Sequence, residues 1–357
     1  MTSLFDPLQA GSLHLKNRIV MAPLTRGRAG ESRIPNAMMA EYYAQRAGAG
    51  MVVAEATAIC REGYGWVGAP AMYTDDMEEG WKQVTQAVHD AGGLIVLQLW
   101  HMGRMSHPDF MEGDLPFAPS AIAPPGQHRS LYKDYVTPRV MGLEDIKRTV
   151  DAFAHGARRA IRAGFDGVEI HGANGYLIDT FLKDSTNKRE DDYGGSLENR
   201  ARLLLEIVDA VTSEIGADRT GLRLSPDEVQ GAVDSDYIAS FTRYAELLNP
   251  ANLAFLHIKE PSRDADKKPR VVPATESMRR VYDGVMILNE GYDRESAAAA
   301  LKNDLGDAIA FGVPFLANPD LPERLRTGAP LNVPDMETFY KGGATGYTDY
   351  PFLRDAA

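Results

Sequence analysis

Three side chains able to donate hydrogen bonds or protons follow one apolar run of the sequence. The run GFDGVEI (164–170) has the composition of a buried strand, and His171, Asn174 and Tyr176 come directly after it. An imidazole and a carboxamide can both donate a hydrogen bond to one oxygen atom, and a phenol can deliver a proton. The segment from Gly172 to Gly175 allows a tight turn that brings these side chains together. Taken alone, the cluster fits a structural hydrogen-bond network equally well, so the elements around it must decide.

Eight short runs rich in valine, isoleucine and leucine recur along the chain, separated by amphipathic stretches long enough for helices. The runs cover residues 18–24, 51–57, 93–100, 167–173, 220–226, 253–260, 284–291 and 307–312. Continuous apolar character is typical of parallel strands that are covered on both faces, and the alternation with helices favours the α/β class. Eight such units predict a (β/α)8 TIM barrel, with residues 1–357 forming a single domain.

Other segments are predicted to complete the barrel. Residues 197–215 carry an apolar stripe at helical spacing between Ser196, a plausible N-cap, and Gly216, a plausible stop. Residues 4–17 are expected to close the lower end of the barrel, away from the carboxyl ends of its strands, as a hairpin. The proline-rich stretch 101–140 is too long for an ordinary connection, so we expect a long excursion after the third strand, folded over the mouth. Residues 260–274 are expected on the same rim.

The alternation of side chains along a strand places further polar groups inside the barrel. Gln98 and Trp100 share one face of the third strand, and Arg223 points inward on the fifth. An inward guanidinium requires compensation, because an isolated buried charge is strongly unfavourable. Two partners remain open for Arg223: a carboxylate such as Glu169 or Glu55, or an anionic or carbonyl-rich ligand.

Composition narrows the function further. The 50 acidic and 38 basic residues give a net charge of −12, which opposes binding to nucleic acid. No segment has the apolar length of a signal peptide or a membrane span, so a cytoplasmic protein without membrane contacts is expected. The single cysteine, Cys60, permits no intrachain disulfide and no thiolate metal cage.

Several common chemistries lack their motifs. The stretch GAGMVV (48–53) lacks the third glycine of a dinucleotide fingerprint, and no phosphate-binding loop, zinc-protease helix or serine elbow occurs. Too few strand ends carry metal ligands to predict a metal site. A glycosidase using Glu55 and Glu169 remains an alternative, although both residues lie a residue or more too deep and each is expected to have an arginine partner.

Motifs along nearly the whole chain resemble those of the Old Yellow Enzyme family. The most specific are HGANGYLIDTFL (171–182) and NKREDDYGGSLENR (187–200); NRIVMAPLTR, VVAEAT, HMGR, RLSP, AFG, ANPDL and TGYTDYP occur in the same order as in the family. The resemblance implies a flavin-dependent ene-reductase on a TIM barrel, with FMN across the barrel mouth and NADPH or NADH as the reductant.

The resemblance also implies roles for individual residues toward FMN. Thr25 lies near the reactive edge of the flavin, Pro23 and Ala56 contribute backbone contacts, and Gln98 binds the pyrimidine. Arg223 holds the electron-rich N1 and O2 side, which fits an inward cation because reduced flavin is negative there. Backbone N–H groups around Asn289, Gly291, Gly312 and Val313 receive the phosphate. Members of the family commonly have arginine or lysine in place of Val313, so a charged phosphate contact is missing at this position.

The mechanism implied is ping-pong reduction of a small activated alkene, such as an enone, or of nitro compounds or nitrate esters. His171 and Asn174 bind the substrate oxygen and Tyr176 delivers a proton. Trp66, Trp100 and Tyr347 are candidates to shape the pocket, and ordinary packing accounts for each equally well. The alternatives are a flavin-binding barrel that reduces another acceptor (a quinone or a nitro compound), a flavin-binding protein without alkene turnover, and a barrel hydrolase. A monomer or a homodimer is expected.

Overall fold

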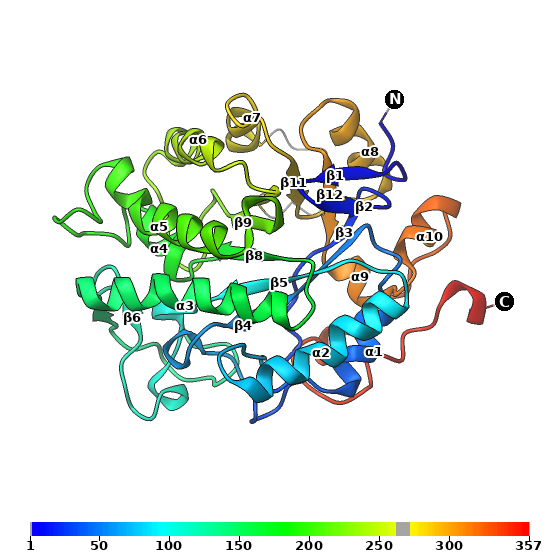
Figure 1. Ribbon diagram of the computed structural model, residues 1–357, viewed down its shortest axis with the longest axis horizontal. Helices are drawn as coiled ribbons and strands as arrows, with labels where there is room; N and C mark the ends of the chain where they lie inside the picture. The colour runs from blue at the N-terminus through cyan, green and yellow to red at the C-terminus, as the bar shows by residue number, and fades with distance from the viewer. Residues whose placement is uncertain (1, 262–271, 357) are drawn as a thin grey trace.

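Parallel strands close into a barrel at the centre of the molecule (Figure 1). A computed structural model describes residues 2–261 and 272–356. The barrel strands are β3 (Ile19–Met21), β4 (Met51–Ala58), β5 (Ile95–Trp100), β8 (Gly167–Gly172), β9 (Thr220–Leu224), β10 (Phe255–Lys259), β11 (Met286–Asn289) and β12 (Ala308–Phe311). They neighbour one another in chain order, and β12 closes the ring by pairing with β3. Seven of the eight predicted runs contain one of these strands, and the run 51–57 ends one residue before β4 does, so the predicted TIM barrel is confirmed.

Helices cover the outside of the strands, as Figure 1 shows for α2, α3, α5, α6 and α8. The helices are α1 (Ala37–Gln45), α2 (Asp75–Asp90), α3 (Leu143–Arg162), α4 (Leu177–Leu182), α5 (Leu197–Ile215), α6 (Tyr237–Leu248), α7 (Pro273–Arg279), α8 (Arg294–Lys302), α9 (Val313–Ala317) and α10 (Leu321–Thr327). The bounds of α5 are those predicted; Ser196 accepts a hydrogen bond from the N–H of Asn199, and Gly216 ends the helix at φ 94°. None of the helices in the described residues is both long and apolar enough to cross a membrane.

Two apolar layers follow from the alternation of side chains along the strands. Outward residues such as Leu97, Leu99, Leu222 and Leu224 join the helices in one large buried cluster. Inward residues form a second cluster that fills the lower barrel, and it includes Val53, Val96, Phe255 and Ile287. Apolar side chains therefore fill the interior below the strand ends, and polar inward side chains occur toward the carboxyl ends.

The N-terminal hairpin closes the lower end of the barrel. Strands β1 (Leu8–Ala10) and β2 (Leu13–Leu15) pair antiparallel. Ala10, Leu13 and Leu15 belong to the same buried cluster as the barrel interior. The prediction for residues 4–17 is confirmed.

The excursion after β5 contains only short elements. These are η2 (Gly103–Met105), η3 (Pro108–Phe110), β6 (Phe117–Ala118) and β7 (Arg139–Val140). Met102, Met105, Arg129 and Tyr135 from this segment line the cavity at the barrel mouth, as expected for a segment folded over it. Most of the other predicted rim segment, 260–274, lies outside the described residues.

Candidate active site

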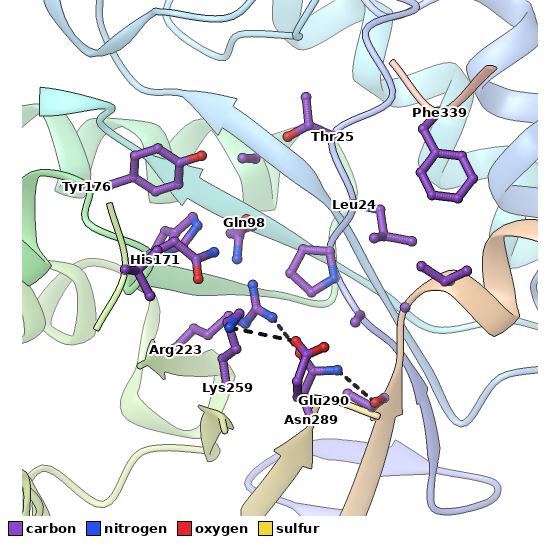
Figure 2. Close-up of a pocket in the computed structure, with 18 of the residues that line it drawn as sticks. Leu24, Thr25, Gln98, His171, Tyr176, Arg223, Lys259, Asn289, Glu290 and Phe339 are labelled. Atoms are coloured by element: carbon purple, nitrogen blue, oxygen red, sulfur yellow. Dashed lines mark hydrogen bonds and ion pairs between the residues drawn. The ribbon is translucent and has the colours of Figure 1, made fainter. Parts of the chain in front are cut away.

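A cavity of about 580 Å³ lies at the carboxyl ends of the barrel strands. Its volume is within the usual range for cofactor and small-molecule sites. All the predicted site residues except Trp100 and Tyr347 line it: Pro23, Thr25, Ala56, Trp66, Gln98, His171, Asn174, Tyr176, Arg223, Asn289, Gly291, Gly312 and Val313. Figure 2 shows His171, Gln98 and Arg223 pointing into this space from neighbouring strands, with Thr25 and Tyr176 above them.

His171 is a neutral hydrogen-bond donor toward the cavity. Its side chain is buried, and burial lowers the pKa of the imidazole well below its ordinary value, with further lowering by Arg223 and His257. Its Nδ1 accepts a hydrogen bond from the N–H of Ala173, at 3.3 Å. A neutral imidazole that accepts at Nδ1 carries its proton on Nε2. The N–H donor is therefore on the ring nitrogen that the main chain does not use.

The turn after β8 places Asn174 and Tyr176 beside this imidazole. Asn174 and Gly175 both have left-handed backbone conformations, with φ 64° and 75°. The Tyr176 ring packs edge-on against the rings of His171 and Trp100, with centroid distances of 5.0 and 5.3 Å. These contacts fix the plane of the phenol. Burial raises the pKa of Tyr176 above that of a free tyrosine, so the phenol is protonated at neutral pH.

Arg223 is a buried cation whose hydrogen-bonding capacity is only partly used. One terminal nitrogen donates to Oδ1 of Asn289 at 2.6 Å, and Asn289 in turn donates to the carbonyl of Ala310. Arg223 Nε is buried with no hydrogen-bond partner among the described residues. Within residues 2–261 and 272–356, no ion pair joins Arg223 to Glu169 or Glu55, the two carboxylate partners that the sequence left open.

The two buried glutamates form structural hydrogen bonds. Glu169 accepts from Gln98 Nε2 at 2.7 Å, and its other oxygen lies 2.7 Å from His257 Nδ1. Glu55 accepts from the backbone N–H of Arg26 and from the hydroxyl of Tyr43. Neither carboxylate is exposed. Donors other than the expected arginine side chains therefore bind both carboxylates. Because both carboxylates are buried, neither is placed to activate a water molecule as a glycosidase requires.

Two predicted pocket residues lie outside the cavity lining. Trp100 is buried behind Tyr176 and packs on its ring, so it supports the phenol without lining the cavity. Tyr347 is fully buried and stacks on Tyr42, with ring centroids 4.0 Å apart. Of the three candidates, Trp66 alone lines the cavity, where it contacts the ring of Tyr340.

Sequence reasoning missed several lining residues. Lys259 is the last residue of β10, and its charged atom lies 3.7 Å from that of Glu290, which follows β11. The alternation along β10 puts Lys259 on the same face as the inward His257, so the signal for it was present in the sequence. Phe339 and Tyr340 come from the segment after α10, which no strand pattern connects to the barrel mouth. The guanidinium of Arg26 binds this segment by donating to the carbonyls of Phe339 and Gly346.

Comparison with known proteins identifies the family. A family model described as the NADH:flavin oxidoreductase / NADH oxidase family matches residues 3–332. The solved structure of the Old Yellow Enzyme homologue from Zymomonas mobilis is 48% identical and has a TM-score of 0.95; the match covers 98% of this chain and 100% of that one. This protein belongs to the Old Yellow Enzyme family.

Other members extend the comparison. The structure of morphinone reductase in complex with tetrahydroNAD is 45% identical, with a TM-score of 0.93 over 99% of this chain and 98% of that chain. The probable flavin mononucleotide-dependent alkene reductase of Leishmania infantum is 42% identical over 98% of this chain and 97% of its own length. As a member of this family, the protein is an FMN-dependent NAD(P)H oxidoreductase.

The lining residues fit FMN. The buried Arg223, with one donor unpaired, provides a positive charge toward the electron-rich side of a flavin. Gly291 and Gly312, which lack side chains, lie at the ends of β11 and β12, where a main chain can approach a phosphate closely. Val313 follows at the start of α9 and is 43% exposed, and its aliphatic side chain adds no charge there.

Proposed function

We propose that this Old Yellow Enzyme is an ene-reductase that reduces the carbon–carbon double bond of small activated alkenes, such as enones, in a ping-pong reaction. The observation that carries the proposal is the convergence of two donors, His171 and Asn174, and one phenol, Tyr176, on the cavity that fits FMN. When bound, FMN supplies the hydride that it has received from NAD(P)H. The named activities of the relatives, alkene reductase and morphinone reductase, support the same reaction class.

His171 and Asn174 bind the activating oxygen of the alkene. The neutral imidazole donates from Nε2, as its Nδ1 contact with Ala173 requires. Asn174 lines the cavity, and its Oδ1 is buried without a hydrogen-bond partner among the described residues; we assign its amide nitrogen as the second donor. Negative charge grows on the substrate oxygen as the β-carbon is reduced. Two fixed donors therefore stabilise the transition state more than the ground state.

Tyr176 is the proton donor to the α-carbon. Its raised pKa keeps the proton on the phenol at neutral pH, and the two edge-on ring contacts hold the hydroxyl in one direction. A positioned acid of this kind contributes roughly 10²-fold or more to a rate.

The remaining lining residues are assigned to FMN. Arg223 and Gln98 bind the pyrimidine portion, Thr25 lies near the reactive edge, and the backbones of Pro23 and Ala56 contact the ring. The phosphate is held by N–H groups near Asn289, Gly291, Gly312 and Val313. Their common position in the cavity lining supports these assignments.

The test separates the two half-reactions. Purified protein should absorb in the visible range, lose the flavin band on addition of NADPH or NADH, and regain it with cyclohexenone. The variant Tyr176→Phe should slow reoxidation by cyclohexenone while leaving flavin reduction nearly intact. Tyr282→Phe is the matched control, because the buried Tyr282 hydroxyl has no hydrogen-bond partner among the described residues and lies before β11, at the other end of the barrel. Equal losses in both half-reactions of Tyr176→Phe contradict its assigned role.

A further inference from the structure

Three buried charged residues lie behind the turn that carries Asn174 and Tyr176. Asp179 and Lys183, both on or next to α4, are fully buried and form an ion pair at 3.0 Å. Arg104, from the excursion after β5, is 1% exposed, and its charge acts on Asp179. None of the three lines the cavity. They therefore do not touch a ligand, and their effect on the site must pass through the residues that they hold.

Asp179 holds the turn directly. Its Oδ2 accepts the N–H of Gly175 at 2.8 Å, and the preceding N–H, of Asn174, donates to Ser225 Oγ at 2.8 Å. Two successive residues in left-handed conformations are unfavourable unless the surroundings fix them. These two acceptors fix the backbone on either side of the Asn174 side chain. The Asp179 contact also fixes the residue that precedes Tyr176.

Lys183 and Arg104 extend the network to two other walls of the cavity. Lys183 donates to the carbonyl of Asp227 at 2.7 Å, and Arg104 donates to the carbonyls of Gln230 and Ile122. Gln230 itself lines the cavity. The three charges thus connect the turn after β8, the loop after β9 and the excursion after β5.

Burying the charges of this network costs free energy, so the network is a poor source of stability. Asp179 Oδ1 and Arg104 Nε are buried without a hydrogen-bond partner among the described residues. Burial raises the pKa of Asp179, although Lys183 and the N–H of Gly175 act in the opposite direction. Burial likewise lowers the pKa of Arg104 to about 10. Apolar side chains of similar volume often replace a buried ion pair without loss of stability, so geometry is the better explanation for these charges.

We propose that Asp179 is a positioning residue for alkene reduction: by accepting the N–H of Gly175, it holds Asn174 and Tyr176 in their reactive arrangement. The inference rests on the proposed function of these two residues. Lys183 and Arg104 keep the carboxylate oriented and tie it to the neighbouring loops. Asp179 itself contacts neither substrate nor FMN.

The test uses three variants of the FMN-loaded protein. Asp179→Leu/Lys183→Met replaces both charges of the ion pair by apolar side chains of similar size, so the protein should fold and retain FMN. In this variant the N–H of Gly175 has lost its acceptor. Asp179→Asn keeps a carbonyl oxygen that can accept the same N–H. Asp234→Asn is the matched control, because Asp234 forms another buried ion pair, with Arg200, that does not touch the turn.

The measured quantity is the rate of reoxidation by cyclohexenone per bound FMN, with Tyr176 present and with Tyr176→Phe. Asp179→Leu/Lys183→Met should slow reoxidation at least about tenfold in the presence of Tyr176, as expected for a misplaced reacting group. The same double replacement should cost less in the Tyr176→Phe background than with Tyr176 present, because the part of its effect that acts through Tyr176 is already lost there and only the part that acts through Asn174 remains. Asp179→Asn and Asp234→Asn should each stay within about threefold of the parent.

The outcomes separate this inference from the proposed function. If the parent protein is not reoxidised by cyclohexenone, the proposed function fails; if Tyr176→Phe alone leaves reoxidation unchanged, the proton-donor role of Tyr176 fails. If Tyr176→Phe slows reoxidation but the Asp179→Leu/Lys183→Met effect is absent or fully additive, the positioning role alone is overturned. A loss in Asp179→Asn as large as in the double replacement also overturns it, because the acceptor oxygen is then not what matters.

Discussion

Replacing Asn174 by glycine isolates the contribution of its carboxamide. The residue has φ 64°, so alanine at this position adds backbone strain, whereas glycine adopts the conformation freely. The backbone N–H that donates to Ser225 is retained in Asn174→Gly and in Asn174→Ala. Loss of one of two donors to a growing oxyanion costs roughly 3 kcal/mol of barrier, which corresponds to about 150-fold in rate. Both variants should therefore lose the same activity, and Asn174→Ala alone should also lose about 1 kcal/mol of unfolding free energy.

Stopped-flow absorbance of the flavin band measures the first effect. The reduced protein is mixed with cyclohexenone, and the reoxidation rate is normalised to bound FMN; urea unfolding of the same samples gives the free energy of unfolding. The expected result is two variants with equal reoxidation rates and unequal stabilities. A glycine variant that reoxidises within about threefold of the parent would refute the assignment of Asn174 as an oxyanion donor, since that loss is far below the range for such donors.

Three further results are expected from the fold and the site. Gly221→Ala should lower the free energy of unfolding in urea by about 1–3 kcal/mol, because the added methyl group would lie 2.1 Å from the Phe255 ring in the filled barrel floor; an unchanged unfolding midpoint would contradict this packing. Val313→Arg should slow the release of FMN about fivefold, measured by flavin fluorescence, because it adds a partly exposed cation at the phosphate end; an equal effect on riboflavin release would show that the phosphate is not involved. Burial lowers the pKa of five histidines, His101, His128, His155, His171 and His257, so the unfolded chain takes up protons that the folded protein does not. The free energy of unfolding should therefore fall as the pH drops through about 6.5, by roughly 1.4 kcal/mol per pH unit for each fully buried histidine, and the slope should be smaller by one proton in His101→Asn.

Local patterns were sufficient to predict the barrel and the floor of its cavity. Continuous apolar runs identify parallel strands, and the alternation of side chains identifies Gln98 and Arg223 as inward because each strand is short and regular. The turn after β8 was predictable because its polar residues directly follow a strand. The resemblance to a family added the assignments to FMN, which the residue pattern alone left open.

The cavity walls were less predictable, because they depend on contacts between distant segments. Tyr347 lies in a recognisable motif but packs on Tyr42, away from the cavity. Phe339 and Tyr340 reach the cavity only because Arg26 binds the backbone of their segment more than 300 residues away in sequence. Neither periodicity nor spacing carries information about such pairings. Trp100 was correctly placed on the inward face of its strand, but the Tyr176 ring covers it.

The order in which the chain is synthesised has a consequence for how the enzyme acquires its flavin. Strand β3, near the N-terminus, has no neighbour on one side until β12 emerges, and the backbone partners of Arg26 at Phe339 and Gly346 emerge later still. A ribosome-bound nascent chain that lacks these residues has neither a closed ring nor a complete wall at its mouth. Loading with FMN is thus expected as a post-translational event, carried out by the released polypeptide.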